Sequence, residues 1–186
     1  MNKSDFRRWY TEPIRALAAV QHHRIAALML SASVLEAILR KRHAMTPTAS
    51  PRGHNGFLDE LEVHFPKLLV VGEPRLGASY WWHAFRNGFI HRITFNVDDG
   101  PVTLQGVIEH GSGSPPAACW KENATTYKVT ANPKAFARRV IDIARNSGEL
   151  ADVEAMVEHT PPAPTATPSG SDPIIQLPLT RSANVP

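Results

Sequence analysis

The segment from Pro13 to His43 constrains the fold of this chain most, because its apolar residues repeat at helical spacing on two faces. The first face contains Ile25, Leu28, Met29, Ala32, Leu35 and Leu39, which recur every three or four residues. A second stripe contains Leu30, Val34 and Ile38. A helix with two apolar faces needs cover on more than one side, so we expect the central helix of a bundle, or one shared between subunits.

Glu36 lies among these apolar positions, which is unusual for a carboxylate. A buried carboxylate without a partner costs several kcal/mol, because the charge loses its water without gaining a counter-ion. We therefore expect a cationic partner for Glu36 elsewhere in the chain.

Two shorter helices are expected after this long one. The stretch 45–56 (MTPTASPRGHNG) is rich in turn-forming residues and predicts a loop. The stretch 57–65 (FLDELEVHF) has the spacing of a short amphipathic helix, which Pro66 ends. A further helix is predicted from about Ser79 to His91.

The pattern then changes from helical to extended. Residues 102–108 (VTLQGVI) and 125–130 (TTYKVT) predict strands, and 98–101 (DDGP) predicts a turn. Residues 93–97 fit either a first strand or the end of the preceding helix. Asn132-Pro133 is a typical helix start and predicts a helix to about Arg145.

These elements together predict a mainly helical domain over residues 1–158, with a small antiparallel β-hairpin insertion at about 93–130. From residue 159 to 186 the chain contains seven prolines and no aromatic residue, so we expect a disordered, proline-rich tail.

Composition narrows the cellular setting. The chain has 186 residues, no apolar run long enough for a membrane span, and no signal-peptide pattern at its start. We therefore expect a cytoplasmic protein that does not enter a membrane. Cys119 is the only cysteine, and no cluster of cationic residues flanks it in the sequence, so we interpret it as a packed thiol.

Positive charge is concentrated near the N-terminus. The formal net charge is +3, but residues 1–45 hold eight Lys/Arg against three Asp/Glu. This excess could face phosphates, or it could be a solvated helix face whose arginine stems cover the core.

The helix at 79–91 carries the candidate functional residues. On an α-helical wheel His83, Asn87 and His91 form a polar stripe, and aromatic residues occupy the opposite arc. Arg86 falls within the apolar arc, roughly 140° from His91. We therefore expect Arg86 to be partly buried and paired, with Glu36 as the natural partner.

The spacing Arg86-Asn87-x-x-x-His91 resembles the Arg-x4-6-His motif of the HEPN superfamily (higher eukaryotes and prokaryotes nucleotide-binding). The order of a long helix ending in 33–39 (SVLEAIL), a loop, a short helix and the motif helix is similar too. The chain is especially similar to bacterial HEPN-like proteins with an Arg-Asn-Gly-x-x-His signature. The resemblance spans residues 13–95 and, in that group, extends to about 145.

The resemblance implies a helical bundle that dimerises so that two motifs meet in one cleft, and metal-independent RNA endonuclease activity. In that role His91 would move protons as general acid or base, and Arg86 would stabilise the phosphate in the transition state. Asn87 would orient the phosphate or His91, and His83 would be auxiliary. RNA, a second copy of the chain and an antitoxin or other protein would be its partners, and no cofactor or metal would be needed.

The same residues also fit a non-catalytic interaction or nucleic-acid-binding module. Arg86 would then pair with Glu36 to lock two helices together. His91 would cap the C-terminal end of its helix, where an imidazolium is favoured.

Overall fold

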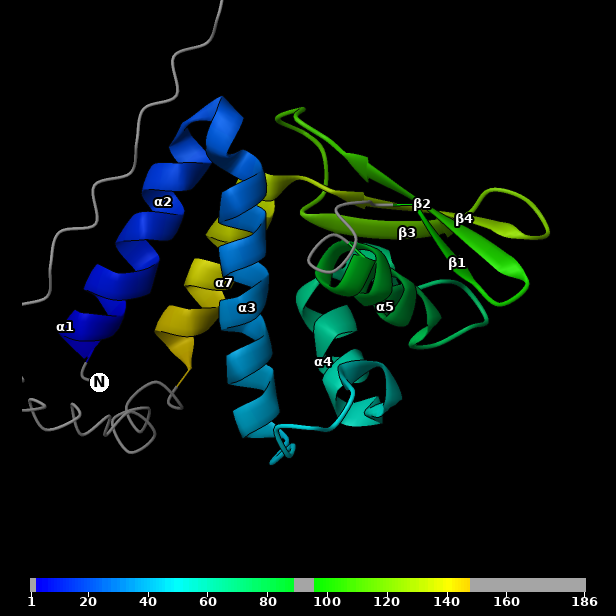
Figure 1. Cartoon of the computed structure of the whole chain (residues 1–186), viewed down its shortest axis with the longest axis horizontal. Helices are drawn as coiled ribbons and strands as arrows, with labels where there is room; N and C mark the ends of the chain where they lie inside the picture. The colour runs from blue at the N-terminus through cyan, green and yellow to red at the C-terminus, as the bar shows by residue number, and fades with distance from the viewer. Residues whose placement is uncertain (1–2, 89–95, 148–186) are drawn as a thin grey trace, which may run out of the picture.

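The computed structural model describes residues 3–88 and 96–147 (Figure 1). A series of helices forms the start of the first range. Its elements are α1 (Lys3–Phe6), η1 (Arg7–Thr11), α2 (Glu12–Ala19), η2 (Gln21–His23) and α3 (Arg24–Arg42). The prediction of a single helix over 13–43 is therefore wrong, because the backbone is extended rather than helical at Val20 (φ −96°, ψ 122°). The break lets α2 fold back on α3, so that Ile14 and Ala18 of α2 are buried.

Helix α3 lies at the centre of the helical part. It packs against α2 and α7 (Pro133–Asn146) on one side, and against α4 (Asn55–His64) and η5 (Trp82–Gly88) on the other (Figure 1). This confirms the expectation of a helix covered on several sides, and explains its two apolar stripes.

The middle of the chain is a series of short helices. They are η3 (Pro51–Gly53), α4, η4 (Pro66–Leu68), α5 (Leu76–Trp81) and η5. Helix α4 confirms the expected short helix, and Pro66 follows it as predicted. The expected helix at 79–91 differs, because from Trp82 to Gly88 it has the wider π-helical form.

A four-stranded sheet follows, and it corrects the expected fold class. Its strands are β1 (Val97–Asp99), β2 (Val102–Ile108), β3 (Ala117–Lys121) and β4 (Thr126–Ala131), in the order β1-β2-β4-β3. Strands β2 and β4 are parallel, with Thr103 opposite Thr126, whereas the other two pairs are antiparallel. The described chain is therefore mixed α/β rather than a mainly helical bundle with an antiparallel hairpin insertion.

The sheet is larger than expected because two strands lack a clear sequence pattern. The sequence predicts a turn at 98–101 and leaves 93–97 as either a first strand or a helix end, and residues 117–121 (AACWK) do not alternate apolar with polar residues. Strand β2 has the predicted bounds, and β4 lies within one residue of them. The alternative of a first strand at 93–97 falls mostly outside the described residues.

An aromatic core joins the sheet to the helices. The rings of Phe65, Trp81 and Phe136 stack with centroid separations of 4.9 Å from Phe136 to each of the other two. The Trp81 indole Nε1 donates to the backbone oxygen of Thr130 in β4 at 2.9 Å. This bond fixes α5 against the sheet and therefore positions η5, which continues directly from it.

Helix α7 begins as the sequence predicts. The Asn132 side chain accepts a hydrogen bond from the backbone nitrogen of Ala135, and Pro133 occupies the first turn. Within residues 3–88 and 96–147, no helix combines the length and apolarity needed to cross a membrane. The expected tail at 159–186 lies outside the described residues.

Candidate functional site

Glu36 holds two arginines, one from its own helix and one from η5. The Arg86 Nε donates to Glu36 Oε2 at 2.7 Å, and the Arg40 Nε donates to Glu36 Oε1 at 2.7 Å. Both arginine side chains are about one-fifth exposed (22% and 21%), and Glu36 is 14% exposed. The expectation that Arg86 is partly buried and paired with Glu36 is confirmed.

The ion pair between Arg86 and Glu36 connects residues that are 50 apart in sequence. Together with Arg40 it leaves a surplus of positive charge. One carboxylate faces two guanidinium groups, so the cluster carries a formal charge of +1. Arg40 is fixed further by a hydrogen bond from its NH1 to the backbone oxygen of Thr46 at 2.9 Å. We refer to Glu36, Arg40 and Arg86 as the arginine cluster.

The other members of the predicted motif are only partly described. Asn87 lies in η5, but its side chain is outside the described part of the structure, and so is His91. The structure therefore does not test whether Arg86, Asn87 and His91 come together.

The π-helical form of η5 bears on the geometry of the motif. An i→i+5 hydrogen-bond pattern makes the turn wider than in an α-helix. The π-helical segment contains Arg86 and ends at Gly88, so it covers only the first part of the motif. Short π-helical turns occur frequently at functional sites, and this distortion falls on the predicted motif.

His83 belongs to a different network on the sheet side of η5. Its Nδ1 lies 3.2 Å from Arg52 NH1. The Arg52 guanidinium also donates to Asp99 Oδ2 at 2.5 Å and to Ser79 Oγ at 3.1 Å. Arg52 thus connects η3, η5 and β1.

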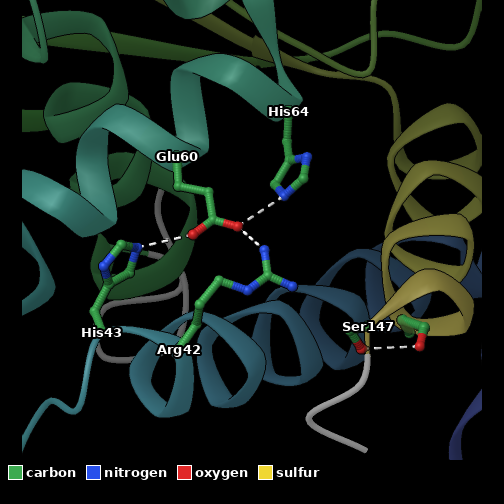
Figure 2. A network of polar contacts seen from close by, with 6 residues as sticks. Arg42, His43, Glu60, His64 and Ser147 are labelled. Atoms are coloured by element: carbon green, nitrogen blue, oxygen red, sulfur yellow. Dashed lines mark hydrogen bonds and ion pairs between the residues drawn. The ribbon is translucent and has the colours of Figure 1, made fainter.

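A second polar cluster, which the sequence analysis missed, lies near the C-terminal end of α3 (Figure 2). The Glu60 carboxylate points between His43, His64 and Arg42 (Figure 2). His43 Nε2 lies 2.8 Å from Oε2, and His64 Nε2 lies 3.2 Å from Oε1. The Arg42 guanidinium forms an ion pair with Oε1.

The contacts of this Glu60 cluster connect α4 to the C-terminal end of α3. One of its contacts was open to sequence analysis, because Glu60 and His64 are four residues apart in the helix expected at 57–65. The contacts with Arg42 and His43 depend on how the intervening loop folds back, which no local pattern reveals.

The electrostatic surroundings of both histidines favour neutral imidazoles. Burial lowers the pKa of His64, and the Arg139 and Arg42 guanidinium groups lower it further. Burial, the neighbouring His54 and Arg42 lower the pKa of His43, against a smaller effect of Asp59 in the opposite direction.

Metal binding finds no support in the described ranges. Within residues 3–88 and 96–147, no group of three or more His, Cys, Asp or Glu side chains has an arrangement suited to a metal ion. Cys119 is buried, as expected for a packed thiol, and burial raises its pKa to about 12. At neutral pH the group is therefore a thiol and a poor nucleophile.

Comparison with protein-family models, curated proteins and solved structures finds no match. The resemblance to HEPN proteins therefore remains a prediction from the motif and its helices.

Proposed function

We propose that this chain is a metal-independent RNA endonuclease whose reaction centre contains Arg86 and His91. The observation that carries the proposal is the arginine cluster, in which the predicted motif arginine is held on Glu36 at 2.7 Å with one-fifth of its side chain exposed. A guanidinium fixed in this way suits a phosphate group, because little conformational entropy is lost on binding.

The surplus charge of the cluster supports the same role. The pentacoordinate phosphate formed during RNA cleavage carries more negative charge than the diester from which it forms. Fixed positive charge therefore stabilises it more than the substrate, and this difference accelerates the reaction. Arg40 adds to this field while Glu36 keeps both guanidinium groups in place.

The proposed step needs no metal and no added water. The ribose 2′-oxygen attacks phosphorus, the bond from phosphorus to the 5′-oxygen breaks, and a 2′,3′-cyclic phosphate and a 5′-hydroxyl result. A neutral His91 accepts the 2′-hydroxyl proton, and an imidazolium donates a proton to the leaving oxygen. In a homodimer, which we also propose, the two copies of His91 can divide these tasks.

Cleavage of transfer RNA and total RNA in EDTA tests the proposal. Wild-type protein should cut, and His91→Ala should lose cleavage while unfolding at the same temperature as wild type. His22→Ala removes an exposed histidine outside the motif, so it should keep full activity. Arg86→Lys keeps the charge but loses the planar fork, so it should cut more slowly than wild type. If the wild-type protein leaves RNA intact in this assay, the proposal is wrong.

A second candidate is a non-catalytic module that binds RNA or protein, such as an antitoxin. The ion pair between Arg86 and Glu36 favours it, because that pair links α3 to η5 whether or not a reaction occurs. In this case Arg86→Ala would destabilise the fold, and His91→Ala would lower stability slightly by removing a helix cap, with no cleavage activity to lose. Sedimentation at micromolar concentration checks the homodimer separately, since a monomer would contradict it.

A further inference from the structure

Residues of α2 and α7 line a groove. These two helices lie on the side of α3 away from α4 (Figure 1). The volume of the groove is about 530 Å³. Buried Ala18, Ala137 and Ile141 form its floor, and the small alanine side chains leave the space open. This basic groove is separate from both polar clusters described above.

The rim of the basic groove is strongly cationic. Exposed Arg15, Lys134, Arg138 and Arg145 line it, with Asp142 as the one acidic side chain among the lining residues. The net charge of these lining residues is +3, which equals the formal charge of the whole chain. The rim is therefore locally positive and can attract a polyanion.

The cationic side chains of α7 are spread along the helix rather than gathered at one place. Lys134, Arg138 and Arg145 are four and seven residues apart, so they share one side of the helix. At 1.5 Å per residue the line of these side chains is roughly 16 Å long. That length is too long for a single small anion and spans several phosphates of a nucleic-acid strand.

A second hollow of about 260 Å³ continues the line at the N-terminal end of α7. It shares Lys134 and Arg138 with the first and adds Arg24 and His110. The Arg24 Nε is buried without a hydrogen-bond partner among the described residues.

We propose that the basic groove binds the phosphate backbone of a single-stranded RNA segment. The inference rests on the proposed function for the choice of RNA as the polyanion. The groove would hold RNA away from the arginine cluster, so it would contribute to affinity without taking part in the chemistry. A second copy of the chain fits less well, since its net charge is also positive.

The test separates binding from cleavage with two RNA ligands. A fluorescent 2′-O-methyl oligonucleotide reports binding by anisotropy, because without a 2′-hydroxyl it is not cut by the proposed step. Natural RNA in EDTA reports cleavage. The variant is Lys134→Gln with Arg138→Gln. The matched control is Lys67→Gln with Lys121→Gln, which removes the same charge from exposed positions on η4 and β3.

Loss of two phosphate contacts should lower the slope of log K against log salt by roughly 1.4, which corresponds to roughly 25-fold weaker binding at 0.1 M salt. The control pair should stay within about twofold of wild type. Equal loss in both double variants, or no loss in either, would overturn the groove proposal. Failure of wild type to bind the oligonucleotide would overturn it as well.

The two proposals fail in different ways. If the oligonucleotide binds through the groove but natural RNA is not cut, the groove stands and the nuclease proposal is wrong. If wild type cuts RNA and the groove variant binds as tightly as wild type, the nuclease proposal stands and the groove is wrong.

Discussion

Replacing Glu36 by Gln tests the arginine cluster most sharply. The substitution keeps the size of the side chain but removes the charge that two arginines share, at 2.7 Å on each side. A hydrogen bond to a charged group contributes roughly 1.5 to 3 kcal/mol, and removing one partner of a buried pair costs roughly 3 to 5 kcal/mol. Since both arginines are about one-fifth exposed and Gln keeps one acceptor oxygen, we expect a loss of about 2 to 4 kcal/mol.

Urea unfolding at pH 7.5 measures this loss as a lower midpoint at unchanged slope. Glu12→Gln is the matched control, because Glu12 pairs with Arg7 at the surface, with 54% and 69% of the two side chains exposed. Exposed pairs contribute at most about 1 kcal/mol. An E36Q protein within about 0.5 kcal/mol of wild type would refute the claim that Glu36 holds the two arginines in place.

Three further substitutions or conditions test other parts of the account. Gly77→Ala should destabilise the protein by about 1 to 3 kcal/mol in thermal unfolding, because a Cβ there would clash with the backbone oxygen of Leu68. The control Gly53→Ala, which has open space around it, should be nearly neutral. A stabilised G77A protein would contradict the packing at Gly77. The free energy of unfolding should fall as pH drops below about 6.5 and be retained above it, because the pKa of His64 is lowered in the folded protein and the unfolded chain takes up protons first. His64→Gln should flatten this dependence. An unchanged pH profile in that variant would argue against a lowered pKa of His64. Cys119 should react with a thiol reagent at pH 8 far more slowly in native than in urea-unfolded protein, and equal rates would contradict its burial.

Local sequence patterns were enough for elements with strong periodicity or caps. Strand β2 and helix α7 follow from alternation and from the Asn132-Pro133 start, which depend on residues close together in the chain. The partner of Glu36 was also predictable, because a buried carboxylate needs a cation and Arg86 was the one placed on an apolar face.

The rest depends on contacts between distant segments. No residue pattern near Val20 predicts that the helix ends there. The break is stable only because it lets α2 pack on α3. The parallel pairing of β2 with β4 arises from the path of the chain through β3, which the sequence of 117–121 does not reveal. For the same reason the Glu60 cluster was missed, although the Glu60 and His64 pair was within reach of spacing arguments.

The most direct test of the central claim is the chemistry of the RNA ends produced in EDTA. Wild-type protein should leave 2′,3′-cyclic phosphate and 5′-hydroxyl ends, and His91→Ala should leave none at matched stability. Products with 5′-phosphate ends, or equal cleavage by His91→Ala, would contradict a reaction driven by Arg86 and His91.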